Sequence, residues 1–352
     1  MARLNDRLLP RWCRRLLFPL LVVLAGCQPQ APGAPLEEYL VRVARVVGAT
    51  AEVPEPEPLP RYPERRALAV DIPQHSIDVA NFIELHGCDM GELVGFRNSP
   101  LGRLQAPSQR LGYEAAWLAA VAGCAADADA DAGADADGWL GELRDDKRAA
   151  LPALFWNATF AAEEMRAALG FAARPAADDF ADLLRGLSDR LTALEADEFE
   201  LNGLERLLGT LRQGSWAGPA RRDWARWRGH LDAVATLLDD AAPRLCLNRQ
   251  PTPRSRRLYN VFVLFYVEAI QPELALRMRE HEAWIAELAR LSQRLEAVQP
   301  EAYRAWFDAV VAPQQPSSEW RRTQASVLNH ARAWQEIFTS CAIEPGVGLG
   351  QH

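Results

Sequence analysis

The sequence predicts an all-α protein, in which a bundle of amphipathic helices is held by two disulfides and preceded by a proline-rich strap. Apolar residues recur at intervals of three and four along most of the second half, which is typical of helices with one buried face. No stretch shows sustained alternation of apolar and polar residues with turns at strand spacing. The chain has 352 residues, of which 49% are hydrophobic, and we expect one continuous helical domain over residues 36–345.

Residues 1–26 have the layout of a secretory signal peptide. Five arginines precede a short apolar run at 16–24, which is roughly half the length of a bilayer-spanning helix. The run ends in Leu24-Ala25-Gly26-Cys27, which resembles the lipobox of bacterial lipoproteins and implies that Cys27 is acylated and becomes the first mature residue. Gln28, where a retained lipoprotein has aspartate, then implies sorting to the outer membrane, with residues 27–35 as a tether. The alternative is an ordinary signal peptide that happens to end at a cysteine.

The charge of the chain argues against nucleic acid as a partner. Residues 1–26 carry a net charge of +4, so their removal changes the formal net charge from −8 to −12. Binding to nucleic acid requires a basic surface that neutralises phosphates. Lys147 is the only lysine and follows two aspartates, which excludes the glycine-rich phosphate loop of nucleotide-binding proteins.

Local sequence signals in the first half of the domain predict a helix, an extended strap and two loops. Residues 36–47 carry apolar side chains at helical spacing, and residues 53–63 contain five prolines, which predicts an extended strap. Residues 97–102 are rich in turn formers and predict a loop. Alternating aspartates over residues 125–138 invite comparison with a calcium-binding loop, but neither alignment places glycine and glutamate where that loop needs them. We therefore expect a solvated acidic loop at 125–138.

Three strong helical stripes mark the second half, over residues 180–194, 224–238 and 284–298. Pro272 lies within a long apolar-to-amphipathic stretch, and it should break or kink the helix near Ile270, because proline removes a backbone hydrogen bond and clashes with the preceding turn.

The last helix should begin near Ser317 or Ser318 and turn Trp320 and Trp334 inward. Cys341 falls on the same stripe, so we expect it to be buried and bonded. Residues 346–352 form a glycine-rich tail.

Four cysteines remain after Cys13 and Cys27 are set aside, and they allow three pairings. We favour Cys88–Cys124 and Cys246–Cys341, since each pair would join the ends of a plausible helical unit. An exported protein can keep such bonds. No CxxC or paired-histidine spacing accompanies these cysteines, so we expect no metal, and nothing in the sequence indicates a cofactor.

Two ionisable residues lie on apolar stripes. Glu268 interrupts the run 261–270, and His281 shares a row with apolar residues. A buried carboxylate can acquire the raised pKa that a general acid needs. The plainer interpretation, which we prefer, is a satisfied ion pair or hydrogen bond, for example between Glu268 and Arg254, Arg256 or Arg257. Four arginines at 221, 222, 226 and 228 are expected to form a solvated face with some local pairing, and the alternative is a contact for an acidic lipid or a partner.

Trp156, Asn157 and Thr159 form the most unusual polar and aromatic cluster. Such groups suit either carbohydrate stacking or a buried polar network, and we favour the network. The candidate contacts for a ligand or partner are Arg97, Asn98, Trp156, Asn157, Thr159, Arg254, Glu268 and His281. No complete catalytic constellation is present.

Several blocks together resemble the bacterial lipoprotein family catalogued as domain of unknown function 3080. They span most of the mature chain in order and lie at residues 59–63, 97–102, 107–114, 154–159, 251–254 and 260–262. The resemblance implies an envelope lipoprotein with paired cysteines, and it implies no activity.

We therefore expect an outer-membrane lipoprotein that faces the periplasm, is held to the membrane through Cys27, and acts as a non-enzymatic interaction or scaffolding module for an envelope protein partner. The alternative is an envelope enzyme or a binding protein for a cell-wall sugar or lipid, which would use Glu268 or the region of Trp156 and Asn157.

Overall fold

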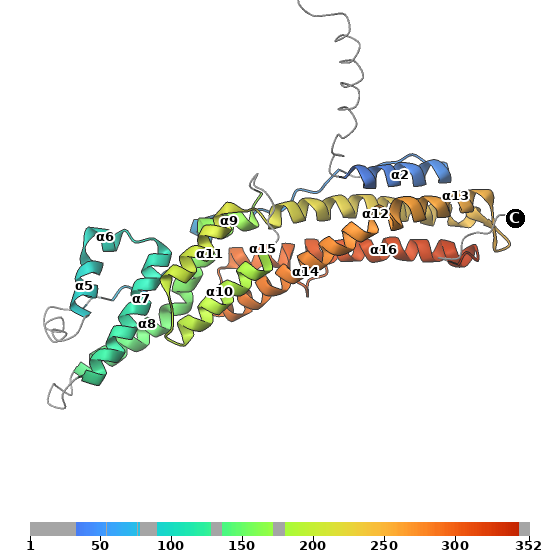
Figure 1. Ribbon diagram of the computed structural model, residues 1–352. Coiled ribbons are helices and arrows are strands. Elements are labelled where there is room, and N and C mark those ends of the chain that lie inside the picture. The colour runs from blue at the N-terminus through green and yellow to red at the C-terminus, as the bar shows by residue number, and fades with distance from the viewer. Residues whose placement is uncertain are drawn as a thin grey trace, which may run out of the picture.

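The computed structural model describes residues 33–53, 55–75, 77, 90–127, 136–171 and 180–344. Helices dominate these residues, which confirms the all-α fold class (Figure 1). Expected features at the signal peptide, Cys27, residues 128–135 of the acidic tract and the tail at 346–352 lie outside the described residues. The helices and strands are α2 Ala34–Val47, α3 Arg65–Leu68, α5 Met90–Asn98, α6 Pro100–Arg103, α7 Pro107–Asp127, α8 Ala136–Thr159, α9 Glu163–Leu169, α10 Phe180–Glu195, α11 Leu201–Gln213, α12 Ala217–Leu245, β1 Cys246–Leu247, β2 Gln250–Pro251, α13 Pro253–Val261, the π-helix η1 Phe262–Val267, α14 Gln271–Arg294, the 3₁₀-helix η2 Glu296–Val298, α15 Glu301–Val310 and α16 Glu319–Ser340.

The molecule is elongated, and α12 runs along much of its length (Figure 1). With 29 residues, α12 is about 44 Å long at 1.5 Å per residue. It packs most extensively against α16, and α2 lies on another of its faces. Helices α5 to α8 form the opposite end of the molecule from α13. The candidate site described below lies along the long pair of helices α12 and α16.

The predicted helical stripes are the buried faces of these helices. Helix α10 buries Phe180, Leu184 and Leu187, as the spacing over 180–194 predicted. Helix α12 buries the row that begins at Trp224, and α16 begins after Ser318, whose hydroxyl accepts a hydrogen bond from the Arg321 backbone N–H. The core is unusually aromatic at the centre, where the rings of Trp224 and Trp284 stack with their centroids 5.8 Å apart.

The expected break at Pro272 is confirmed. Helix α13 passes into the π-helix η1, and a new helix, α14, begins at Gln271 with Pro272 in its first turn. Proline is tolerated there because the first turn leaves its backbone N–H groups without intrahelical partners.

The loop expected at residues 97–102 is wrong. Helix α5 continues to Asn98, and α6 begins at Pro100. The Ser99 hydroxyl accepts a hydrogen bond from the Gly102 backbone N–H, so Ser99 caps α6 and Pro100 occupies its first position. Serine at a helix cap and proline directly after it are start signals for a helix as well as turn formers.

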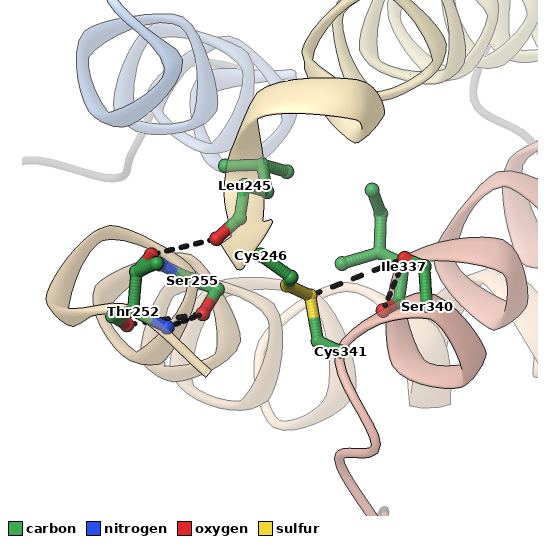
Figure 2. The surroundings of a disulfide bond; sticks show 7 residues. All are labelled: Leu245, Cys246, Thr252, Ser255, Ile337, Ser340 and Cys341. Atoms are coloured by element: carbon green, nitrogen blue, oxygen red, sulfur yellow. Dashed lines mark hydrogen bonds between the residues drawn. A yellow bond between two sulfur atoms is a disulfide. The ribbon is translucent and has the colours of Figure 1, made fainter. Parts of the chain in front are cut away.

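One of the two expected disulfides is present among the described residues. Cys246 and Cys341 are bonded, with their Cα atoms 5.3 Å apart, and Cys341 is buried as its stripe predicted. Figure 2 shows the surroundings of this bond, where Thr252 caps α13 and its hydroxyl donates to the carbonyl of Leu245 at 2.6 Å. Cys88 and the side chain of Cys124 lie outside the described residues, so their pairing stays a prediction.

The ends of the acidic tract belong to helices, since α7 continues to Asp127 and α8 begins at Ala136. The expected strap at 53–63 has neither helix nor strand where it is described. Tyr62 is buried, and its hydroxyl donates to the carbonyl of Phe160 at 2.9 Å, which fixes this segment to the end of α8. Its polyproline conformation stays a prediction.

Candidate functional site

An open groove of about 1060 Å³ lies between residues 53–59, α12 and α16. It is lined by arginines from both helices and by acidic residues from residues 53–59 and α12, while its remaining lining is largely apolar. The charged residues that line it are Glu55, Glu57, Arg222, Arg226, Arg228, Asp232, Arg322 and Arg332. Arginines outnumber carboxylates in this groove, although the whole chain has a net charge of −8.

Helical periodicity places these residues on one side of each helix. The lining positions of α12 include Arg222, Arg226 and Gly229, and those of α16 include Arg322 and Asn329. Steps of three and four residues keep side chains on one face, so about three turns of each helix, roughly 15 Å, border the groove. Helices α12 and α16 run in the same direction, because Arg221 bonds Glu319 near their first turns and Cys246 bonds Cys341 at their ends.

A fully buried ion pair lies beneath the groove. The Arg221 guanidinium donates from Nε and Nη2 to the two carboxylate oxygens of Glu319, at 2.8 and 2.7 Å, and neither side chain has more than 1% of its surface exposed. Nη2 also donates to the carbonyl oxygen of Pro60 at 2.7 Å. This pair therefore joins α12, α16 and the segment after α2.

Arg228 is the second buried arginine of α12. Its side chain is 9% exposed, and Nη1 donates to the Thr323 hydroxyl at 3.0 Å and to the Glu319 backbone carbonyl at 3.3 Å. Burial lowers the pKa of Arg228, and the neighbouring Arg322 lowers it further. The expected solvated face is therefore wrong for Arg221 and Arg228. The reason is that tertiary packing brings the first turn of α16 against this side of α12.

Arg322 faces the same groove from α16. It forms an ion pair with Glu57 at 2.6 Å, and its Nε is buried without an acceptor among the described residues. The hydrogen bond and the charge of Arg322 lower the pKa of Glu57. The groove thus holds two neighbouring guanidinium groups, those of Arg228 and Arg322, and the Glu57 carboxylate pairs directly with Arg322 alone.

The cluster around Trp156 uses its polar groups within the chain. Trp156 is fully buried, and its Nε1 donates to the carbonyl of Leu68 at 2.7 Å. The Asn157 amide accepts from the Val70 N–H at 2.9 Å and donates to the Val70 carbonyl at 2.7 Å. The Thr159 hydroxyl donates to the carbonyl one turn earlier. These bonds fasten the segment after α3 to α8, away from the groove.

Glu268 is exposed and forms no ion pair with a described residue, so the expected burial and the expected pairing with the arginines of α13 are wrong. The cause is the π-helix η1 just before it, which adds a residue to the turn and rotates Glu268 towards solvent. Arg254 is also exposed.

His281 is buried, and its Nδ1 accepts a hydrogen bond from the Trp224 indole at 2.9 Å. Burial, together with the charge of Arg277, lowers its pKa to about 4. Arg97 donates to the carbonyl of Gly102 at 2.7 Å, and Asn98 is exposed. None of the eight candidate contact residues named from the sequence lines the groove, whereas Arg222, Arg226 and Arg228 of the arginine row do.

Sequence reasoning missed Arg322, Arg332 and Glu57. The spacing of the arginines on α12 was visible, but nothing in the sequence indicated that α16 and residues 53–59 would meet them. Within the described ranges no three or more His, Cys, Asp or Glu side chains come together as a metal site, and no helix is long and apolar enough to cross a membrane.

Comparison of the chain with curated proteins and with solved structures gave no match. A family described as "Protein of unknown function (DUF3080)" matches residues 36–345, which is the range expected for the helical domain. The chain therefore belongs to the DUF3080 family.

Proposed function

We propose that this protein is an outer-membrane lipoprotein, anchored through acylated Cys27, whose helical domain acts in the periplasm as a non-enzymatic interaction module. The sequence around Cys27 supports the anchor, and one acyl chain holds a protein only marginally whereas two or three hold it stably. The Cys246–Cys341 disulfide supports an oxidising compartment, in which a second bond between Cys88 and Cys124 would also persist.

The observation that carries the interaction role is the arginine-lined groove between residues 53–59, α12 and α16. It is open, and it holds charged groups that the chain itself neutralises incompletely. Neither Glu268 nor His281 lines it, so the sequence-based candidates for acid–base chemistry do not meet in this cavity. The geometry therefore favours binding over catalysis.

The anchor is tested by the mass and the location of the mature chain. We expect the N-terminal peptide to begin at Cys27 with the added mass of its acyl groups, and the protein to fractionate with the outer membrane. A Cys27→Ala variant should lose both properties. A Gln28→Asp variant should keep the acyl groups and move to the inner membrane. A Cys27→Ala variant that is still cleaved and membrane-bound would contradict the anchor.

The interaction role is tested separately by crosslinking in intact envelopes. We expect the groove variant Arg222→Glu/Arg226→Glu to lose the molecules captured by the parent protein. The matched control is Arg148→Glu on α8, an exposed arginine far along the chain from the groove, which should capture them unchanged. Capture that is equal for the parent and the groove variant would show that the groove is not the interaction surface.

A further inference from the structure

The groove contains a buried cation that lacks a carboxylate of its own. Arg228 forms no ion pair with any described residue, and the two carboxylate oxygens of Glu319 accept from Nε and Nη2 of Arg221. The carboxylates of Glu319, Glu57 and Asp232 act on Arg228 only through their charges, and burial together with Arg322 outweighs them, so that the pKa of Arg228 is lowered. A buried charge is costly unless it is paired and hydrogen-bonded, so an anion bound beside Arg228 would offset the cost of burying its charge.

Arg322 supplies a second set of donors at the same place. Its buried Nε has no acceptor among the described residues, and its other contact is the largely exposed Glu57. Two adjacent guanidinium groups with free N–H donors match the oxygen atoms of a phosphate, which arginine binds in a bidentate manner. Glu57 competes with such a ligand for Arg322.

Exposed apolar side chains lie among the charged residues of the groove, and the groove is close to the proposed anchor. Leu328 is 70% exposed and Val53 is 45% exposed, and both line the groove. Gly33 lies against Arg226, since an added Cβ would stand 2.7 Å from the Arg226 Cδ. Five residues lie between Cys27 and Gly33, so the anchor attaches at most about 22 Å from Gly33. Exposed apolar side chains beside arginines are typical of surfaces that meet a lipid headgroup region.

We propose that the groove binds the phosphate of a glycerophospholipid headgroup, with Arg228 and Arg322 as its ligands and Leu328 and Val53 against the glycerol and acyl carbons. This inference rests on the anchor proposed above. The exposed apolar side chains of Leu328 and Val53 and the short reach from Cys27 favour a lipid over an acidic peptide.

The test titrates the full mature lipoprotein, in an uncharged detergent, with dihexanoyl phosphatidylglycerol below its micelle concentration and measures the heat of binding. We expect saturable binding at one site that weakens as salt is raised. Inorganic phosphate lacks the glycerol and acyl carbons, and dihexanoylglycerol lacks the phosphate. Each should bind at least tenfold more weakly than dihexanoyl phosphatidylglycerol. A hexamer of glutamate tests the acidic-peptide alternative and should also bind more weakly.

Two variants make opposite predictions. Arg322→Gln removes a phosphate ligand and should weaken binding at least tenfold. Glu57→Gln removes the competing carboxylate and should tighten binding severalfold, whereas a purely structural role of the Glu57–Arg322 pair would weaken binding in both variants. Arg148→Gln is the matched control and should leave the affinity unchanged.

Four results would overturn the proposal: tighter binding of free phosphate, of the phosphate-free lipid or of the glutamate hexamer, or loss of binding in Glu57→Gln. Because these titrations measure binding of an added lipid and not the attachment or sorting of the chain, they can fail while the Cys27 experiments succeed. In that case the anchored interaction module stands without this ligand.

Discussion

The buried pair of Arg221 and Glu319 gives the sharpest test of what holds α12 to α16. Glutamine has nearly the shape of glutamate but carries no charge, so Glu319→Gln leaves a fully buried guanidinium without its counter-charge. Removing one member of a buried pair destabilises a protein by about 3–5 kcal/mol. We expect a loss of this size in the free energy of unfolding, measured by urea denaturation.

Replacing both members tests whether the ion pair itself stabilises the protein or whether only an unpaired buried charge destabilises it. Arg221→Met with Glu319→Leu removes both charges and keeps similar volume, and such replacements of buried pairs are often neutral or stabilising. The variant still loses the hydrogen bond to Pro60, worth about 1 kcal/mol, and the favourable charge of Glu319 in the first turn of α16, worth about 0.3–1 kcal/mol. The free energy of unfolding of the double variant should therefore lie within about 2 kcal/mol of the parent's. This loss is far smaller than the sum of the losses in the two single variants.

The control is Glu273→Gln, which breaks an exposed pair with Arg277 on α14 and should cost no more than about 0.5 kcal/mol. The reasoning is refuted if Glu319→Gln costs less than about 1 kcal/mol, or if the double variant loses as much as the two single variants together. Trypsin cleavage after Arg61 gives an independent measurement, because the hydrogen bond from Arg221 to the Pro60 carbonyl holds this segment. Glu319→Gln should accelerate this cleavage.

Three further predictions concern other contacts. Asn157→Ala removes two hydrogen bonds to the backbone and should lower the free energy of unfolding by about 1–3 kcal/mol, whereas Asn98→Ala at an exposed position should change it by less than about 0.5 kcal/mol. Cys246→Ser opens the bond to Cys341 across a separation of 95 residues and should cost roughly 4–5 kcal/mol in the chain-entropy model, so urea denaturation with reductant should abolish the difference between the parent and the variant. The pKa of His281 is lowered to about 4, so the unfolded chain takes up a proton near pH 6.5 and the folded chain only near pH 4. Stability should therefore fall as the pH drops through this window, by at most about 1.4 kcal/mol per pH unit from this residue, and urea midpoints at pH 7, 6 and 5 should show a shallower fall in His281→Gln.

Helix positions and buried stripes could be read from the sequence because they follow from local periodicity. The starts of α14 and α16 were predictable for the same reason, since proline and serine act on the helix turn in which they lie. The exposure of Glu268 could not be predicted, because one π-helical turn changes the phase of every residue after it and leaves no clear mark in the sequence. The predicted loop at 97–102 failed because serine followed by proline is compatible with both a turn and a helix start.

The groove also combines a feature that the sequence shows with one that depends on tertiary contacts. The arginines of α12 were visible as a charged row, and a row of like charges on a helix usually faces solvent. Burial of Arg221 and Arg228 required partners from distant segments, because Glu319, Thr323 and the backbone of α16, together with the carbonyl of Pro60, offer the acceptors to their donors.

The sequence by itself determined the fold class, the family and the buried faces of the helices, and it favoured the cysteine pair at the ends of α12 and α16. These features depend on residue spacing within one helix or on residue type. Only the tertiary structure decided which arginines are buried, which carboxylates neutralise them and where an open groove remains. The physical reason is that the balance of charge and burial at a site is set by side chains from distant segments, and their meeting depends on how the helices pack.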